Sequence, residues 1–464
     1  MTALGRLRLP TVAFVIVAAG SAAVAASSPD PLKLPDSALQ PLGWSELDGW
    51  GADDHAAGFS VFLASCRPLL KGAKPLPETK PMSEALAAVC RRASVAGRLN
   101  AEQARKFFER NFRPNHVARL SESLGLLTGY YEPIVDGSRF PTREFTVPIY
   151  RRPDDLVLLT ARRDGEGFPN KGEVGRRVGD QVVTPYFDRA EIENGALDGR
   201  HLEICWIKDP IDLLFIQIQG SARIRLEDGL LLRVNYDSHN GLPFTPVGRP
   251  LIERNIIPRE EMSMARIRKW MLANPEEARE VRQSNRSFVF FRITGLGDEG
   301  EPAGGQGVRL TPGRSIAVDK SLHAYGTPFF IQADLPITSE RPSTRFRRLM
   351  IAQDTGSAIV GPARADLFFG AGDDAGRVAG RIKQMGRFAM LVPREIDPGL
   401  AAARLSLPPP RPHILDQPVP LPRPRPALES APSVAAGAVR HSEPEAGKPR
   451  AAPDPGLPRP PSVR

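Results

Sequence analysis

The chain has 464 residues, of which 41% are hydrophobic and 25% are charged, so it contains enough apolar material for one or two packed cores and is neither wholly disordered nor fibrous. Two of the nine net positive charges lie in residues 1–27 and four in residues 401–464, which leaves three for residues 28–400, called the body below. This small surplus argues against nucleic acid as the partner of the body.

Residues 1–26 have the pattern of an export signal. Arg6 and Arg8 precede an apolar stretch that ends in the small-x-small sequence Ala-Val-Ala at 23–25. We therefore expect cleavage just after this sequence and a periplasmic location. No Cys lies near the expected cut, so lipidation is not expected. The apolar run is also close to the minimum length of a membrane-spanning helix, and an uncleaved anchor is the alternative.

The first part of the body is predicted to be helical. Apolar residues at helical spacing predict helices over about 44–70 and 82–95. Asn100, followed by Gln103, has the form of a helix N-cap with a capping partner, which predicts a further helix to about Phe112. From about 124 to 240, β-branched residues, glycines and turn signals dominate and predict a β-rich region.

The second half of the body alternates between the two kinds of pattern. Residues 214–221 alternate with a period of two, which predicts a strand. A short helical stretch runs from Met264 to Leu272. Short apolar segments bounded by turn residues then predict the strands of a small β-barrel at 287–292, 315–318, 327–331 and 348–353. Residues 376–384 are predicted to form one helix, and the proline-rich residues 399–464 a disordered tail.

The cysteine and histidine patterns favour no metal or other cofactor. The three cysteines have no metal-binding spacing, and the seven histidines form neither an H-x-H nor an H-E-x-x-H motif. An odd number of cysteines leaves at least one free or intermolecular thiol. The sequence leaves open whether Cys66 and Cys90 form a disulfide or remain buried thiols with Cys205.

Three aspartates at turns after apolar strands are the candidates for chemistry: Asp319, Asp354 and Asp366. Asp366 is followed by Leu-Phe-Phe, and apolar surroundings raise the pKa of a carboxyl group toward the range that a general acid needs near neutral pH. The alternative for each aspartate is a structural role, as the cap of a turn.

Several ordered segments of the body resemble one family. They are Gly-Tyr-Tyr-Glu-Pro at 129–133, Gln-Ile-Gln-Gly-Ser at 217–221, Val-Gly-Arg-Pro-Leu-Ile at 247–252, Met-Ser-Met at 262–264, Asn-Arg-Ser-Phe-Val-Phe-Phe at 285–291, and the blocks at 354–359 and 366–370. Over about 124–392 the chain resembles membrane-bound lytic murein transglycosylase A, and the three aspartates resemble those of the 3D domain, a double-psi β-barrel.

The resemblance implies a mainly β fold with N-terminal helices, in which a second β-domain is inserted into a double-psi β-barrel and a substrate groove lies between them. The implied division is a signal at 1–26, a helical part leading into the barrel at 27–133, the inserted β-domain at 134–287, the barrel at 288–398 and the tail at 399–464. The resemblance also implies peptidoglycan glycan strands as the substrate.

The family cleaves the β-1,4 bond between N-acetylmuramic acid and N-acetylglucosamine without water and leaves a 1,6-anhydromuramoyl end. Ordinary glycosidases need two carboxyl groups. Here the O6 hydroxyl of the sugar is the nucleophile, so one carboxyl group suffices. By resemblance this acid/base is Asp366, and Asp354 is the supporting carboxylate that raises its pKa.

The remaining motif residues are expected to line the sugar groove. This set comprises Tyr130, Tyr131, Glu132, Gln217, Gln219, Gly220, Ser221 and Asp319. The tyrosines would stack on sugar rings and the polar side chains would bond hydroxyl and acetamido groups. Core packing is the alternative for the tyrosines, a plain turn for Gly220, and a structural role for Asp319.

Two other classes of protein remain open. Asp-Thr-Gly-Ser at 354–357 also occurs in aspartic proteases, but a pepsin-like chain needs the motif twice and it occurs once here. A wall-binding module without activity would keep the groove and use the aspartates structurally. For the transglycosylase we expect a monomer, with wall, divisome or elongasome proteins as partners of the tail.

Overall fold

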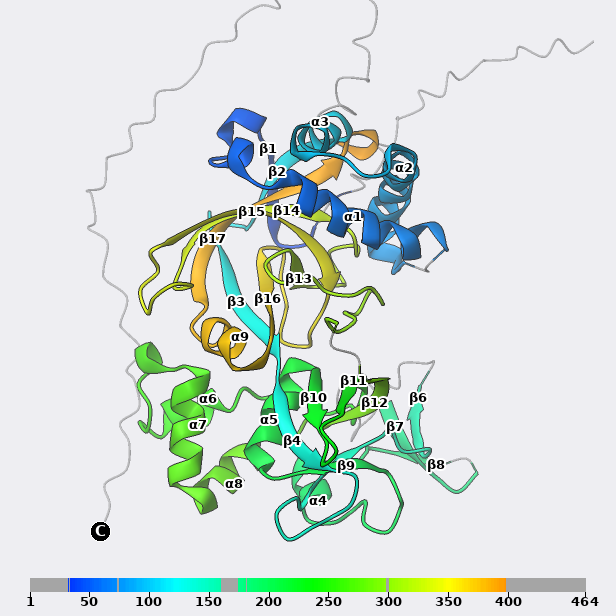
Figure 1. Cartoon of the computed structure of the whole chain (residues 1–464), viewed down its shortest axis with the longest axis vertical. Coiled ribbons are helices and arrows are strands. Elements are labelled where there is room, and N and C mark those ends of the chain that lie inside the picture. Colours follow the sequence, from blue (N-terminus) through cyan, green and yellow to red (C-terminus); the bar gives the residue numbers. More distant parts are fainter. Residues whose placement is uncertain are drawn as a thin grey trace, which may run out of the picture. The chain divides into compact units, whose positions relative to one another are not determined.

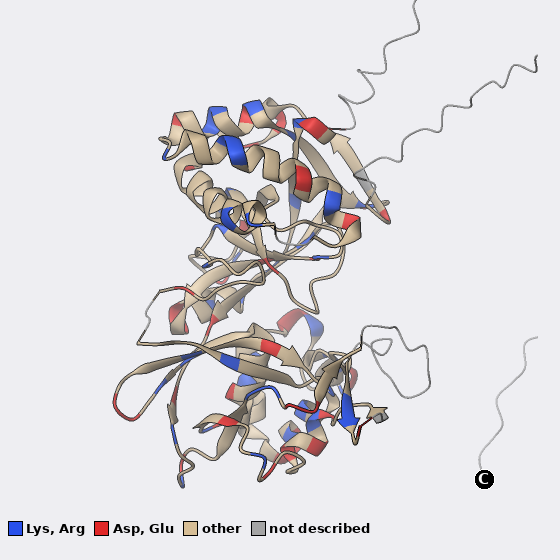
Figure 2. Ribbon diagram, turned by 90° about the vertical axis from the view of Figure 1, so that its right-hand side faces the viewer, with Lys and Arg blue, Asp and Glu red and all other residues tan. Residues whose placement is uncertain are grey.

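The computed structural model describes residues 32, 34–72, 75–159, 174–180, 182–297 and 300–397 (Figure 1). The predicted signal segment and the proline-rich tail lie outside these ranges. No helix among the described residues is long and apolar enough to cross a bilayer. Basic and acidic residues are interspersed along the ribbon (Figure 2), in keeping with the small net charge of the body.

A closed six-stranded β-barrel forms the first part of the fold. Its strands pair in the order β3–β17–β14–β15–β13–β16, and β16 pairs back onto β3. The strands of this part are β1 (Ser37–Pro41), β2 (Phe112–Arg119), β3 (Gly125–Glu132), β13 (Ser315–Val318), β14 (Pro328–Leu335), β15 (Thr344–Asp354), β16 (Arg364–Ala371) and β17 (Lys383–Pro393). β2 and β1 extend the sheet beyond β17.

Helices cover the barrel. They are α1 (His55–Leu70), α2 (Lys80–Ala96), α3 (Ala101–Asn111) and α9 (Gly372–Ala379), with the short 3-10 helices η1 (Trp44–Glu46), η2 (Trp50–Ala52), η3 (Pro77–Thr79) and η6 (Arg394–Ile396). The side chain of Asn100 accepts a hydrogen bond from the Gln103 backbone amide, and the side chain of Gln103 accepts one from the Asn100 backbone amide, which confirms the predicted cap of α3. One continuous apolar core joins α1–α3 to the barrel interior.

A second β-domain is inserted between β3 and β13, and Figure 1 shows β3 continuing directly into it as β4. Its strands are β4 (Ile134–Ser138), β5 (Val147–Tyr150), β6 (Leu156–Leu158), β7 (Val174–Val178), β8 (Val182–Thr184), β9 (Glu203–Ile207), β10 (Ser221–Arg225), β11 (Leu231–His239) and β12 (Val289–Leu296). They form a six-stranded sheet, β12–β11–β10–β4–β9–β5, and a three-stranded sheet, β6–β7–β8.

The inserted domain also carries helices. They are α4 (Arg189–Glu193), α5 (Pro210–Gln219), α6 (Gly248–Glu253), α7 (Met264–Ala273) and α8 (Pro275–Ser284), with the 3-10 helix η5 (Arg259–Glu261). Helices α5–α8 enclose an apolar cluster of their own beside the core of the sheet.

The strand predicted at 214–221 is wrong, because most of this segment belongs to α5. Asp209 caps the helix by accepting a hydrogen bond from the Ile211 amide at 2.7 Å, and Gly220 ends it with a left-handed φ of 83°. α5 lies between two apolar clusters, with Leu213 in one and Leu214 in the other. Because apolar residues occupy most of its circumference, the helical period is hidden in the sequence.

Two further boundaries differ from those predicted. The segment at 287–292 contributes to β12, which pairs with β11 of the inserted sheet, so the inserted domain ends after Leu296 instead of before residue 288. The helix predicted at 376–384 is α9, which begins at Gly372 and ends at Ala379, and Lys383 already starts β17.

Candidate active site

Asp366 lies in the middle of the barrel wall, on β16. It is paired with Ala317 of β13 on one side and Thr128 of β3 on the other. Alternation along β16 turns Leu367 into the barrel core and places Phe368 in a small apolar cluster outside it. Asp366, two residues before Phe368, therefore shares that outer face.

Asp366 is held through one of its two carboxyl oxygens. The Thr128 hydroxyl donates to Asp366 Oδ1 at 2.6 Å, and Arg364 Nη2 donates to the same hydroxyl oxygen at 2.8 Å. No described group forms a hydrogen bond with Oδ2. Burial raises the pKa of Asp366 to about 6, against the lowering effects of the Arg364 charge and the Thr128 hydrogen bond, and the charge of Asp354 adds a smaller upward contribution. A carboxyl group with this pKa can exchange a proton near neutral pH.

Asp354, the last residue of β15, has both carboxyl oxygens occupied. Oδ1 accepts hydrogen bonds from the amides of Gly305 at 2.8 Å and Thr355 at 2.9 Å, and Oδ2 accepts one from the Tyr130 hydroxyl at 2.8 Å. Burial raises the pKa of Asp354, and these three hydrogen bonds oppose the rise because they stabilise the carboxylate. Both oxygens of Asp354 thus accept hydrogen bonds from the protein, whereas Oδ2 of Asp366 accepts none from the described residues and can bind a substrate.

An apolar cluster separates the two carboxylates from bulk water on one side. It consists of Tyr130, Leu310, Ala317, Ile359 and Phe368. The rings of Tyr130 and Phe368 pack with their centroids 5.2 Å apart. This cluster is the physical source of the desolvation that raises both carboxyl pKa values.

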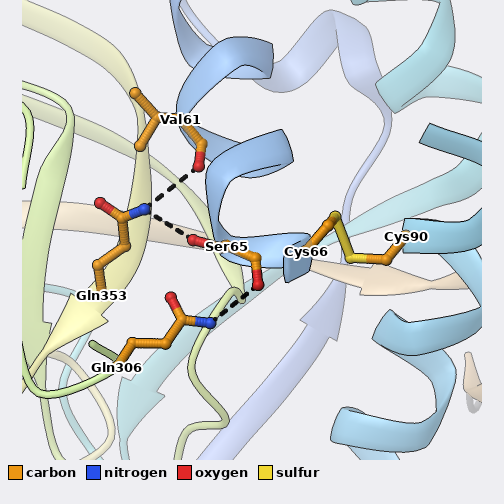
Figure 3. Close-up of a disulfide and its surroundings, with 6 residues drawn as sticks. All are labelled: Val61, Ser65, Cys66, Cys90, Gln306 and Gln353. Atoms are coloured by element: carbon orange, nitrogen blue, oxygen red, sulfur yellow. Dashed lines mark hydrogen bonds between the residues drawn. A yellow bond between two sulfur atoms is a disulfide. The ribbon is translucent and has the colours of Figure 1, made fainter. Parts of the chain in front are cut away.

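The loop that holds Asp354 is anchored to α1. A Cβ at Gly305 would lie 2.5 Å from the Tyr325 hydroxyl, so a larger residue there would require the Tyr325 side chain to move. Gln306, the next residue, donates from Nε2 to the Ser65 carbonyl at 3.1 Å, and Gln353 Nε2 donates to the Ser65 hydroxyl at 2.7 Å. Figure 3 shows both side chains converging on this turn of α1.

The disulfide that the sequence left open is formed. Cys66, directly after Ser65, is bonded to Cys90 and so joins α1 to α2 (Figure 3). Cys205 is a free, buried thiol, and burial raises its pKa to about 12, which makes it a poor nucleophile.

Two residues of the Gly-Tyr-Tyr-Glu-Pro segment, Tyr130 and Glu132, do not lie as a sugar platform would require. Tyr130 is only 8% exposed and its hydroxyl is bonded to Asp354, so its ring has little free face. Glu132 is fully buried and forms ion pairs with Arg223 at 2.6 Å and Arg233 at 2.9 Å. These contacts fit a structural role for Glu132 at the end of β3 better than the expected substrate-binding one.

Tyr131 remains half-buried, and its backbone amide donates to Gln219 Oε1 at 3.0 Å. Gln217 is buried and donates from Nε2 to the Val289 carbonyl at 3.1 Å, which ties α5 to β12. Gly220 is the end of α5 and Ser221 is buried at the start of β10. Of the Gln-Ile-Gln-Gly-Ser segment, only Gln219 keeps a partly accessible functional side chain beside β3.

Asp319 is a turn residue. Its Oδ1 accepts hydrogen bonds from the Ser321 amide and hydroxyl, and its Oδ2 accepts one from the Gly361 amide at 2.8 Å. These bonds tie the turn after β13 to the segment before β16. The structural alternative for Asp319 therefore fits its contacts better than a substrate-binding one.

Three residues of the site are not among those predicted from the sequence: Thr128, Arg364 and Tyr325. Arg364 precedes Asp366 by two residues on β16 and so shares its face of the strand. Thr128 lies near Asp366 because β3 and β16 are parallel neighbours. A Cβ at Gly305 would lie 2.5 Å from the Tyr325 hydroxyl and 3.4 Å from Asp354 Oδ1, so both groups approach Gly305. Burial and the charge of Asp354 raise the pKa of Tyr325. A parallel pairing between segments more than 200 residues apart leaves no local signal in a single sequence.

A separate cleft of about 470 Å³ opens where the barrel part meets the inserted domain. It is lined by Ile134 and Asp136 of β4, Asp212 of α5, and Gly372 and Asp373 at the start of α9. Neither Asp354 nor Asp366 lines it. No group of three or more histidine, cysteine or acidic side chains suited to a metal ion occurs in the part of the chain that the structure describes.

Comparisons with known proteins match both parts of the fold. The family model of the MltA specific insert domain matches residues 126–292, and that of the 3D domain matches residues 314–392. Membrane-bound lytic murein transglycosylase A of Vibrio cholerae is 32% identical over 267 residues, which cover 56% of this chain and 64% of that protein. The chain thus spans slightly less than two thirds of the length of the curated relatives it matches.

Solved structures are similar over more of the chain. The crystal structure of a membrane-bound lytic murein transglycosylase from Agrobacterium tumefaciens is 36% identical with a TM-score of 0.70, covering 79% of this chain and 99% of that one. The structure of Escherichia coli MltA with bound chitohexaose is 25% identical with a TM-score of 0.54, covering 77% and 92% of the two chains.

The fold and the site define a double-psi β-barrel protein with an inserted β-domain and two carboxylates on the outer face of the barrel, and the predicted fold class is confirmed. The chain belongs to the MltA family, the family of membrane-bound lytic murein transglycosylase A.

Proposed function

We propose that this protein is a lytic transglycosylase that cleaves the β-1,4 bond between N-acetylmuramic acid and N-acetylglucosamine in peptidoglycan and leaves 1,6-anhydromuramoyl ends. The observation that carries the proposal is the contrast between the two carboxylates. Asp366 has a pKa raised to about 6 and one oxygen without a hydrogen bond among the described residues, whereas Asp354 is occupied by three donors. One residue is therefore suited to proton transfer and the other to holding charge.

The reaction requires no second proton-transferring group. Asp366 donates its proton to the oxygen that links the two sugars, and the bond from that oxygen to C1 of the muramoyl unit breaks. The O6 hydroxyl of the same unit then bonds to C1, and its proton returns to Asp366. Asp354, held as an acceptor, contributes negative charge that favours both the protonated state of Asp366 and the positive charge developing at the sugar ring.

The names of the relatives support this substrate class, and chitohexaose bound to the Escherichia coli relative is an oligosaccharide. Tyr131 and Gln219 are the half-buried residues that we retain as candidates for sugar contacts. The geometry gives no support to an aspartic protease, in which two carboxylates share one proton. Among the described residues Asp354 and Asp366 form no hydrogen bond with each other, and the oxygens of Asp354 are already occupied.

We place the enzyme in the cell envelope, where peptidoglycan is found, with release from its signal segment in the periplasm. N-terminal sequencing of the protein recovered from cells tests this location. A new N-terminus just after residue 25 or 26 supports it, and an intact Met1 favours the anchored alternative.

The function is tested by digesting purified peptidoglycan in water enriched in oxygen-18 and analysing the products by mass spectrometry. Anhydro ends without the heavy isotope are the expected result, because the nucleophile is the sugar itself. Reducing ends that carry oxygen-18 would identify a hydrolase, cleaved stem peptides a protease, and binding without any cleavage a wall-binding module. Each of these three results would refute the proposal.

A further inference from the structure

The contacts of Thr128 determine the direction of its hydrogen bonds. An arginine side chain donates hydrogen bonds and never accepts them, and a threonine hydroxyl has a single proton. Because Arg364 Nη2 donates to the Thr128 oxygen at 2.8 Å, the one proton of the hydroxyl is left for Asp366 Oδ1, 2.6 Å away. The two hydrogen bonds therefore have one possible direction, with Arg364 donating to Thr128 and Thr128 donating to Asp366.

Barrel strands fix the positions of these three hydrogen-bonded residues. Thr128 and Asp366 are direct register partners on the parallel strands β3 and β16, in the closed ring of the barrel. Arg364 Nη1 also donates to the Ala365 carbonyl at 2.6 Å, which fixes the guanidinium beside its own strand. Among the described residues Arg364 forms no ion pair.

Oδ1 of Asp366 accepts the Thr128 proton, so the proton of the neutral acid is left for Oδ2, to which no described group bonds. We infer that Thr128 and Arg364 are positioning residues that direct the acid proton of Asp366 to Oδ2 and so select the oxygen that serves the sugar. This inference rests on the proposed function, because it concerns the acid/base of that reaction.

The same pair also affects how readily Asp366 loses its proton. The groups that face Asp366 are Thr128 and Tyr130 from β3, Asp354 from β15 and Arg364 from β16, while β13 presents the apolar Ala317. The Arg364 charge and the Thr128 hydrogen bond lower the pKa of Asp366, and burial raises it to about 6. A residue that donates a proton and then accepts one works best at a pH where its protonated and ionised forms are both populated.

Paired substitutions separate this role from a merely structural one. Thr128→Val keeps the shape and removes the hydroxyl, whereas Thr128→Ser keeps the hydroxyl. Arg364→Gln removes the charge, whereas Arg364→Lys keeps it. Arg345→Gln, near the opposite end of β15, removes an equal charge from an exposed position and serves as the control.

The first readout is the pKa of Asp366 in each full-length variant, measured from the carbon-13 shift of its carboxyl group without substrate. We expect Arg364→Gln to raise the pKa by about one unit or more and Thr128→Val to raise it by less, because each change removes a group that favours the carboxylate. Thr128→Ser, Arg364→Lys and the control should stay close to the wild type.

The second readout is turnover on purified peptidoglycan. Thr128→Val should lower kcat by about tenfold with KM little changed, since a hydrogen bond to a charged group is lost and glycan contacts are not. An unchanged Asp366 pKa in both Thr128→Val and Arg364→Gln would overturn the inference, and so would a Thr128→Ser variant that behaves like Thr128→Val. Failure of the wild type to form anhydro ends would instead refute the proposed function, while the titration would still test the positioning.

Discussion

Glu132 offers a direct test of how the barrel is joined to the inserted domain. Both arginines that pair with it, Arg223 and Arg233, come from the inserted sheet, and both also donate to the Gly300 carbonyl in the returning connection. Glu132 itself ends β3, the outgoing connection. One buried carboxylate thus pairs with two buried arginines at the point where the chain crosses between the two parts, and Glu301 lies 3.7 Å from Arg223 as a second acidic partner.

We predict that Glu132→Gln lowers the free energy of unfolding by about 3–5 kcal/mol, the usual cost of removing one partner from a buried ion pair. The amide keeps the volume of the side chain but removes the charge that pairs with both arginines, although Arg223 retains Glu301 at 3.7 Å. The matched control is Asp136→Asn, a few residues further along the chain. Asp136 pairs with Arg225 at 2.8 Å, but these side chains are 66% and 56% exposed, so the loss should be below about 1 kcal/mol.

Urea unfolding of the full-length protein, followed by tryptophan fluorescence and circular dichroism, measures the difference. A loss of about 4 kcal/mol corresponds to nearly a thousandfold change in the unfolding equilibrium, since about 1.4 kcal/mol is a factor of ten. Equal effects of Glu132→Gln and Asp136→Asn would refute the reasoning, because the two sites differ chiefly in burial. Replacing Arg233 by Met in the Glu132→Gln background should recover part of the loss, since one of the two buried positive charges that contacted Glu132 is then removed.

Three further predictions concern the site and its supports. Asp354→Asn should shift the alkaline limb of the pH–rate profile to lower pH, because removal of a like charge lowers the pKa of Asp366; an upward shift would contradict this. Replacing Cys66 and Cys90 together by Ser should lower the free energy of unfolding by about 3 kcal/mol, the value for a loop of their 24-residue separation, and denaturation with and without reductant would show no difference if this is wrong. Truncation after Asp397 should leave activity on purified peptidoglycan intact, and loss of folding or turnover would disprove it.

The elements with strong local signals could be predicted from the sequence. The cap formed by Asn100 and Gln103 marks the start of α3, and the short apolar segments around 315–318 and 348–353 are barrel strands. Where two apolar clusters enclose one segment, as at α5, periodicity no longer separates helix from strand. β12 has the same apolar character as a barrel strand, and only its pairing with β11 assigns it to the inserted domain.

The candidate acids could be predicted because turn aspartates after apolar strands are a local pattern. Only part of the environment of these acids could be predicted from the sequence. The apolar residues after Asp366 indicated desolvation, but Arg364 and Thr128 act on its pKa more strongly than Asp354. Arg364 lies two residues before Asp366 on the same strand, whereas the contact with Thr128 depends on the three-dimensional pairing of β16 with β3. Similarly, Tyr130 is buried by its contacts with Phe368 and Asp354, and Glu132 by its ion pairs with arginines of the inserted sheet, and these contacts between distant segments leave no local signal.

The central claim is that Asp366 alone transfers the protons of the reaction, and the turnover of Asp366→Asn on purified peptidoglycan tests it most directly. The pKa of Asp366 is raised in the folded state, so its ionisation disfavours folding as the pH rises through about 6, and the amide should be at least as stable as the wild type at pH 7. We predict intact folding and glycan binding with a loss of two or more orders of magnitude in the formation of anhydro ends. Turnover near the wild-type rate would contradict the assignment and leave Asp354 as the leading acid.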